Sequence, residues 1–309
     1  MGMMAFFTRK DATLSTMRPE TQREAIVASL LVTAWVVEAR DPYTGGHLWR
    51  MARYAALLGE RAGMTPDQCA QVALAAFVHD IGKAHVPESI LGKREALSDD
   101  EFAIIRTHPE MGARMLAGHP YAAMVSDAVL LHHETPDGMG YPRGLKGTSI
   151  PATARIVGLC DAFDAMTSAR PYRAAMSVDE ALSAIESQLG RQFDEFLGRH
   201  FLALGREGVL ERIVGHGDEG LPLQSCVRCG PTLVVRREHR AGDTLVCPAC
   251  GASHRLTALG ASRSGPLKAE PTGEMGTALE RMPDPDMMLI RRFVQESIGL
   301  AVQQAYAVA

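Results

Sequence analysis

The sequence predicts an all-α domain, followed by a small β zinc ribbon and a terminal helix. Three observations support this fold class. From Thr21 to Gly215 apolar residues recur at helical spacing, and no alternating pattern typical of strands appears. Two Cys-x-x-Cys-Gly motifs, at Cys226 and Cys247, flank short strand-like stretches. After Pro285, apolar residues again recur at the spacing of an amphipathic helix.

The bulk composition is that of a globular protein. A chain of 309 residues can bury one full core and one smaller core, and 46% hydrophobic residues is ordinary for this class. The net charge of −4 argues against a strongly basic, nucleic-acid-binding surface. The longest apolar run, Ile26–Val37, is too short to span a bilayer, and Met1–Arg9 lacks a signal-peptide pattern. We therefore expect a cytoplasmic protein without a membrane span.

Capping signals place the helices of the predicted domain. Thr65 followed by Pro66 opens one helix, because proline suits the first helical position. Ser98 and Glu101 form a capping box that opens another, and Gly63 closes the helix that precedes Thr65. The expected helices span 21–40, 47–61, 66–80, 122–133, 152–167, 178–189 and 193–204, with one more that starts at Ser98 and carries His108.

The two Cys-x-x-Cys motifs predict a structural zinc site. Its ligands would be Cys226, Cys229, Cys247 and Cys250. The glycine after each pair permits the positive φ that the turn needs. The metal would supply the folding free energy that a ribbon of about 35 residues cannot obtain from its core. A redox-active dithiol is the alternative, whereas structural disulfides do not suit a chain without an export signal.

The sequence divides into five segments. They are a lead-in over 1–20, the helical domain over 21–215, the ribbon over 221–256, a flexible linker over 257–285 and an amphipathic helix over 286–309. The terminal helix either docks on its own chain or forms a homodimer, and its residues favour neither. The ribbon is locally basic, although for a ribbon of this size we favour protein contact over nucleic acid.

Histidine and aspartate residues recur along the predicted helices. The candidate ligands are His47, His79, Asp80, His108, His132, His133 and Asp161. Neighbours on a helix diverge by about 100°, so His132 and His133 cannot easily share one ion. Two ions resolve this geometry if Asp80 bridges them, with His79 on one ion and the histidine pair on the other. Five imidazoles and two carboxylates suit two octahedral ions, with iron(II) or manganese the best match.

With these residues in place, the chain resembles the HD-GYP family. This branch of the HD-domain phosphohydrolases degrades the bacterial second messenger cyclic di-GMP. The likeness covers about Asp41 to Phe196. Its motifs are Asp41–His47, His79–Lys83, His108-Pro109, His132–Glu134, Gly140–Pro142, Ala154–Ile156, Asp161–Met166 and Arg170–Arg173. One departure is Glu195, which follows Phe193-Asp194 where the family has proline.

The resemblance implies roles for the site residues. The seven candidate ligands would hold the metals, and Asp80 and Lys83 would be catalytic, with Lys83 at a phosphate. Tyr141, Arg170 and Arg173 would hold the dinucleotide. Asp164 and Glu134 would orient ligand histidines, although Glu134 suits a helix surface nearly as well. Some members bind a third metal through a glutamate one helical turn before the first histidine, and Tyr43 stands there.

The resemblance implies a metal-dependent phosphodiesterase that hydrolyses cyclic di-GMP to pGpG, GMP or both. The two ions would lower the pKa of a bound water, which makes hydroxide available near neutral pH. One alternative is a phosphodiesterase for another cyclic dinucleotide. Another is a signalling scaffold that binds a protein partner, such as a diguanylate cyclase, through the Gly140–Pro142 loop and the ribbon. Turnover of cyclic di-GMP separates the three hypotheses.

Overall fold

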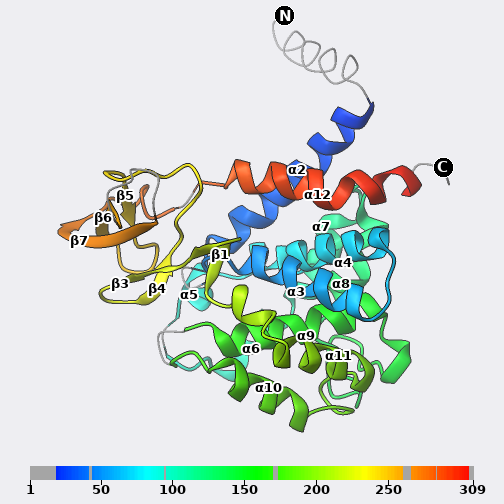
Figure 1. Ribbon diagram of the computed structural model, residues 1–309. Coiled ribbons are helices and arrows are strands. Elements are labelled where there is room, and N and C mark those ends of the chain that lie inside the picture. The colour runs from blue at the N-terminus through cyan, green and yellow to red at the C-terminus, as the bar shows by residue number, and fades with distance from the viewer. Residues whose placement is uncertain are drawn as a thin grey trace, which may run out of the picture.

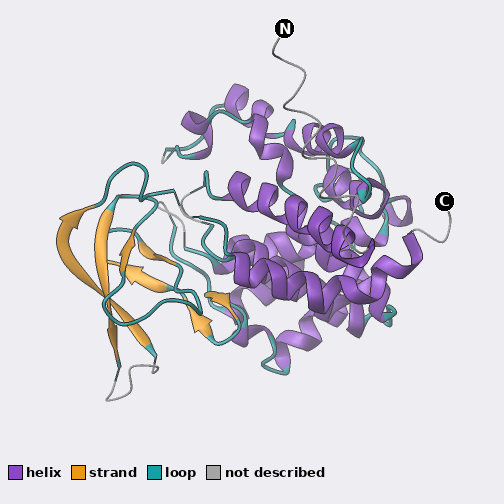
Figure 2. Ribbon diagram, turned by 90° about the horizontal axis from the view of Figure 1, so that it is seen from above, coloured by secondary structure: helices purple, strands orange, loops and turns teal. Residues whose placement is uncertain are grey.

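The computed structural model describes residues 19–41, 44–93, 95–169, 173–259, 266–282 and 284–305, with side chains from 21 to 296. A helical body lies beside a smaller β region (Figures 1 and 2). Tyr43 and Arg170, which carried two of the expectations from the sequence, lie outside the described residues, as does most of the lead-in.

The helical body follows the order that the sequence predicts, except that the single helix expected from Ser98 through His108 is two helices, 99–105 and 108–116. Its α-helices are α2 (Pro19–Glu38), α3 (His47–Arg61), α4 (Pro66–Val78), α5 (Glu88–Leu91), α6 (Asp99–Ile105), α7 (His108–Leu116), α8 (Ala122–Leu131), α9 (Ala152–Thr167), α10 (Val178–Ser187) and α11 (Glu195–Arg206). Short 3-10 turns are η1 (Ile81–His85), η2 (Gly147–Ser149) and η3 (Leu210–Arg212). As the sequence predicts, a capping box at Ser98 begins α6 and Pro66 opens α4. The structure adds a second capping box, which Thr65 and Gln68 form at the start of α4.

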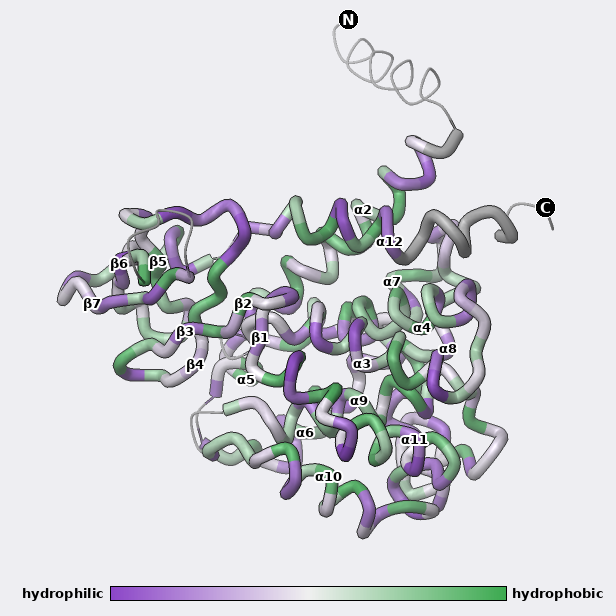
Figure 3. Tube along the Cα trace, in the orientation of Figure 1, coloured by the Kyte–Doolittle hydropathy of each residue, from purple (hydrophilic) through white to green (hydrophobic). Residues whose placement is uncertain are grey.

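The core lies where α3, α4, α8 and α9 meet. Hydrophobic residues run along α4 and α8, which pack together (Figure 3). The rings of Tyr54 and Phe201 pack edge-on against Phe163, with centroids 5.3 and 5.0 Å away. These rings fix α3, α9 and α11 relative to one another, so the helices that carry candidate ligands rest on a rigid support.

Gly82 decides how η1 meets α7. A Cβ atom there would lie 1.9 Å from the carbonyl oxygen of His108, so only glycine permits this approach. The sequence predicts a helix that continues to His79-Asp80, whereas α4 ends at Val78. The tighter turn of η1 then brings Asp80 and Lys83 beside the start of α7.

The C-terminal region is antiparallel β structure. Its strands are β1 (His216–Asp218), β2 (Leu221–Pro222), β3 (Gln224–Cys226), β4 (Gly230–Leu233), β5 (Thr244–Val246), β6 (Ala252–Ala258) and β7 (Leu267–Met275). β1 pairs with β2 and β3 with β4, and β5, β6 and β7 form a three-stranded sheet in that order. The all-α expectation therefore holds for the helical body, and a small β region follows it, as the sequence predicts.

The prediction of a flexible linker over 257–285 is wrong in part. β6 continues to Ala258, and β7 pairs with it so that Leu256 faces Ala269 and Arg255 faces Glu270. The glycine, serine and proline content of this segment hid the strand. Pro271 is compatible with it because β7 is an edge strand, where a missing N–H costs little.

The terminal helix α12 (Met287–Ala305) lies across α2 and α4 (Figure 1). Leu289, Ile290, Phe293 and Val294 are buried in the core of the helical body. The Phe293 ring lies 5.2 Å from that of Phe77 in α4. Of the two roles that the sequence left open, the structure shows docking on the same chain. None of the described helices has the length and hydrophobicity that a bilayer crossing needs.

Truncation of Ile290 tests this docking. The side chain is 0% exposed, so Ile290→Ala should lower the free energy of unfolding by about 2–5 kcal/mol through lost burial and a residual cavity. Met288→Ala is the matched control, because Met288 is 52% exposed on the same helix. Urea denaturation followed by circular dichroism measures both variants. Equal stabilities would contradict the docked position of α12.

Candidate metal centre

The ends of several helices bring the predicted ligands together. The contributions are His47 at the start of α3, His79 and Asp80 between α4 and η1, His108 at the start of α7, His132 and His133 directly after α8, and Asp161 within α9. All six elements pack on one core, so residues more than a hundred positions apart in the chain become neighbours. His47 Nε2, for example, lies 3.9 Å from Asp161 Oδ1.

Asp80 stands at the middle of this cluster. Its Oδ1 atom lies 3.1 Å from His108 Nε2 and 3.8 Å from His132 Nε2. Its Oδ2 atom lies 3.3 Å from His79 Nε2. The two carboxylate oxygens thus face different histidines, which is the arrangement that a bridging carboxylate needs.

The candidate ligand atoms, those of Asp80 included, fall into two groups. One contains His47, His79 and Asp80, and the other His108, His132 and His133, with the atoms of each group within 4.8 Å of one another. Asp161 Oδ1 lies 3.8 Å from His79 Nε2 and so belongs beside the first group. Two neighbouring sets of nitrogen and oxygen donors suit a pair of divalent ions.

Hydrogen bonds fix the tautomers of the histidines. The Nδ1 atoms of His79, His108 and His132 donate to backbone carbonyls at 2.7–3.0 Å, and His47 Nδ1 donates to Asp164 Oδ2 at 2.8 Å. The Nε2 lone pairs therefore point into the cluster. His79 Nε2 is buried without a hydrogen-bond partner among the described residues. An unpaired buried nitrogen is costly, and a metal ion would satisfy it, so these residues fit a metal.

The electrostatics also favour cations. Burial lowers the pKa of His133 to about 4, and burial with the neighbouring His133 holds that of His132 well below its usual value. Both imidazoles are therefore neutral at pH 7, as metal ligands must be. Burial alone would raise the pKa of the Asp80 carboxyl, but the charges of His79 and Lys83 hold it well below its usual range. The ionised carboxylate is ready to bind a cation.

Arg50 is a residue of the candidate centre that the sequence analysis missed. Its Nε and Nη2 atoms donate to both oxygens of Asp164, at 2.6 and 2.9 Å, and the side chain is 1% exposed. Asp164 in turn holds His47, the contact that its expected orienting role requires. An arginine three residues after His47, on the same face of an apolar helix, was the available signal.

The expected role of Glu134 is corrected. Its carboxylate accepts the backbone N–H groups of Arg143 and Leu145, at 2.6 and 2.8 Å. It therefore fixes the loop that carries Tyr141, and none of its described hydrogen bonds reaches a histidine. A carboxylate beside two histidines resembles an orienting group in sequence, but only the fold shows which donors it meets.

The rim of the centre carries Lys83 and Tyr141. Lys83 Nζ lies 2.6 Å from Asp80 Oδ2. The Tyr141 ring stacks on that of His133, with centroids 4.7 Å apart and an interplanar angle of 24°. Arg106, which the sequence analysis also missed, places its guanidinium 4.5 Å from the centre of the Tyr141 ring.

Beside the candidate metal centre lies a pocket of about 250 Å³. The residues that line it include His133, Asp161, Arg155, Gln192 and Asp194.

Arg173, which was also expected to hold the dinucleotide, is exposed and donates to the Ala165 carbonyl near the end of α9. Because Arg170 lies outside the described residues, only Arg173 of the expected pair is placed.

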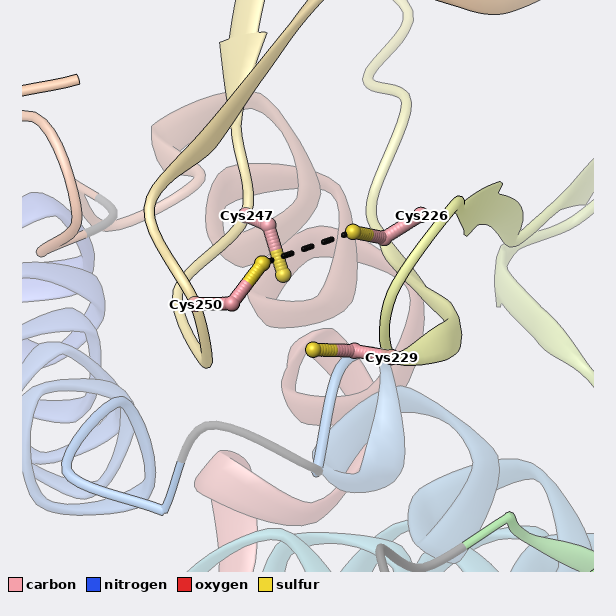
Figure 4. Close-up of side chains that lie close together, drawn as sticks. All are labelled: Cys226, Cys229, Cys247 and Cys250. Carbon is pink, nitrogen blue, oxygen red and sulfur yellow. Dashed lines mark hydrogen bonds between the residues drawn. The ribbon is translucent and has the colours of Figure 1, made fainter. Parts of the chain in front are cut away.

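The four cysteines of the motifs converge in the β region. Their sulfur atoms point toward a common centre from two loops (Figure 4), and all four lie within 4.8 Å of one another. The Sγ atoms of Cys226 and Cys250 are 3.6 Å apart, close to the edge of about 3.8 Å that a zinc tetrahedron with ~2.3 Å bonds has. None of the four forms a disulfide. The donor set and its shape fit one zinc ion.

A family model and several curated proteins match this chain. The family model described as "HD domain" matches residues 32–197. The cyclic di-GMP phosphodiesterase response regulator RpfG of Xanthomonas campestris is 40% identical over 59% of this chain and 48% of its own. A cyclic di-GMP phosphodiesterase of Vibrio cholerae is 35% identical over 62% and 41%. The 3'3'-cGAMP-specific phosphodiesterase 3 of the same organism is 36% identical over 53% and 36%.

The chain spans about half or less of the length of these curated relatives. The HD domain match covers more than half of the 309 residues. The resemblance inferred from the sequence is confirmed: the chain belongs to the HD domain family, and its motifs place it in the HD-GYP branch.

Proposed function

We propose that this chain is a metal-dependent phosphodiesterase that hydrolyses cyclic di-GMP to pGpG, GMP or both. The observation that carries the proposal is the pair of donor groups on either side of Asp80, with Lys83 at its edge. Relatives with 40% and 35% identity are named as cyclic di-GMP phosphodiesterases, which supports this substrate. Because free cysteines suit a reducing compartment, we also propose that it acts in the cytoplasm.

The residues proposed to hold two divalent ions are His47, His79, Asp80, His108, His132, His133 and Asp161. Iron and manganese are the best candidates, because mixed imidazole and carboxylate donors suit both. When bound, the ions would supply a nucleophilic hydroxide and neutralise charge on the phosphate. Asp164 and the backbone carbonyls hold the imidazoles in position, so the chain contributes a preorganised ligand set.

Lys83 and the rim residues would bind the substrate. The Lys83 ammonium, 2.6 Å from Asp80 Oδ2, would stabilise negative charge that develops on a phosphate at the centre. Burial raises the pKa of the Tyr141 phenol, so its hydroxyl keeps its proton and can donate to the substrate. Arg106 beside Tyr141 adds a positive charge. We propose that Arg170 and Arg173 contact the dinucleotide as well, as the family resemblance implies.

A second candidate substrate is 3'3'-cGAMP, since a relative named as specific for it is 36% identical. Both dinucleotides present the same phosphodiester to the metals, so selectivity would depend on contacts with the bases. A role in binding a protein partner, such as a diguanylate cyclase, belongs to a different class. This hypothesis predicts that a variant without phosphodiesterase turnover still forms the complex with the protein partner.

For the β region we propose one structural zinc ion, held by Cys226, Cys229, Cys247 and Cys250. The sulfur positions support this assignment, and so does the small core of the region, in which the buried cysteines themselves form a large part. Zinc bound to four thiolates would replace the stabilisation that such a core lacks.

Replacement of Asp80 tests the enzymatic proposal. Asp80→Asn keeps the shape of the side chain but removes its charge, so turnover of cyclic di-GMP should fall by at least about 10²–10³-fold. Protein purified anaerobically with iron or manganese is assayed by chromatography of pGpG and GMP. Asp127→Asn, an exposed position on α8, is the control and should match the wild type. Absence of both products from metal-loaded wild-type protein would refute the proposal, and faster hydrolysis of 3'3'-cGAMP would favour the second candidate.

Metal analysis tests the zinc assignment. We expect one zinc per chain that is retained in Asp80→Asn, because the cysteine ligands remain intact, and lost in Cys247→Ser. Cys69→Ser is the control, since Cys69 is a half-buried thiol in α4, away from the four cysteines. Zinc that remains in Cys247→Ser but leaves in Asp80→Asn would place the ion in the helical centre instead.

A further inference from the structure

The turn that leads into α3 lies directly against the β region. Gly46, which precedes the ligand His47, has a φ of 74°, and a Cβ atom there would lie 2.7 Å from the carbonyl oxygen of His216 in β1. A Cβ atom on Gly45 would lie 3.1 Å from Val234 Cγ2, just after β4. Two consecutive glycines thus permit backbone contact between the two regions at the first ligand of the metal centre.

Arg50 spans this contact. Its Nη1 atom donates to the carbonyls of Gly45, at 2.7 Å, and of His216, at 3.0 Å. Its Nε and Nη2 atoms hold Asp164, which accepts the Nδ1 proton of His47. One buried side chain therefore connects strand β1 to the ring orientation of a proposed metal ligand.

The donor inventory of Arg50 shows why the β1 carbonyl matters. A guanidinium has five N–H groups. Their acceptors here are Asp164 Oδ1, Asp164 Oδ2, Ser168 Oγ, the Gly45 carbonyl and the His216 carbonyl. Because the side chain is buried, departure of β1 would leave an N–H group unpaired and would favour reorientation of the whole network.

The same contact continues to the four cysteines. Thr232 in β4 places its Oγ1 atom 3.3 Å from Cys247 Sγ, and its carbonyl oxygen lies 3.3 Å from the Cβ position of Gly45. β4 begins directly after Cys229 and pairs with β3, which ends at Cys226. A metal ion on the cysteines would therefore order the strand that lies against the Gly45-Gly46 turn.

We propose that Arg50 is a positioning residue. Through it, the four-cysteine region, which is the part of the β region that holds Cys226, Cys229, Cys247 and Cys250, keeps His47 in its metal-binding orientation. A metal ion on the cysteines then raises the affinity of the helical centre for its own ions. The inference rests on the proposed function, in which both sites hold metal. Coupling of this kind is reciprocal between the sites and typically changes affinity by about 5–150-fold.

The test is the manganese affinity of the folded protein, measured by titration with paramagnetic resonance of free Mn²⁺. Arg50→Lys keeps a positive charge beside Asp164 but cannot reach all five acceptors, so we expect affinity to fall by about 10–100-fold. Cys247→Ser should lower it by at least about 5-fold. Arg53→Lys, an exposed position on the same helix, should match the wild type.

A double variant separates positioning from general destabilisation. Because both changes act through one contact, Arg50→Lys with Cys247→Ser should weaken manganese binding no more than Arg50→Lys alone. Wild-type affinity in Cys247→Ser protein that has lost its zinc would overturn the inference, as would additive losses in the double variant.

A comparison without a substitution covers the case in which Cys247→Ser does not fold. Wild-type protein prepared with and without zinc on the cysteines should differ in manganese affinity by at least about 5-fold, and equal affinities would overturn the inference. Absence of manganese binding by zinc-loaded wild-type protein would overturn the proposed function as well, so the two failures are distinguishable.

Discussion

The Asp80 carboxylate is buried among His79, His108 and His132, and the organisation of the helical domain follows from that placement. A buried negative charge is costly unless cations surround it. In the metal-free protein, Lys83 at 2.6 Å and the raised pKa of His79 provide that compensation, although burial of His79 opposes it. Divalent ions would satisfy the same demand, and one of them would replace the proton on the buried Nε2 atom of His79.

Several local features of the chain produce this arrangement around Asp80. α4 ends one residue before His79, and Gly82 lets the following turn lie against α7. α8 ends before His132 and His133, which leaves both rings at the end of a helix rather than on diverging faces of its middle. The candidate ligands are thus supplied mainly by helix ends, while the helices themselves provide the rigid core.

Local sequence features allowed much of this to be predicted. One capping box and one initial proline located helix starts, and histidines on apolar helices indicated candidate ligands, because buried imidazoles need a partner. The roles of Arg50 and Arg106 could not be predicted in this way, since their partners Asp164 and Tyr141 are distant in the sequence. β7 was missed because an exposed edge strand tolerates the residues that are typical of a linker.

The β region is tied to the helical body at more than one point. Asp218 in β1 is buried and accepts hydrogen bonds from Arg237 of the β region and from Arg292 of α12. α12 in turn packs its apolar face into the helical core. The four-cysteine region is therefore held between the start of α3 and the last helix, which gives it a physical connection to the metal centre.

Anomalous X-ray diffraction from crystals that contain manganese and zinc tests the bridging role of Asp80 most directly. Two manganese peaks should flank the Asp80 carboxylate, one beside His79 and the other beside His132, with a zinc peak about 2.3 Å from each cysteine sulfur. A single manganese peak in the helical domain, or peaks that do not contact Asp80, would contradict a two-metal centre organised by this residue.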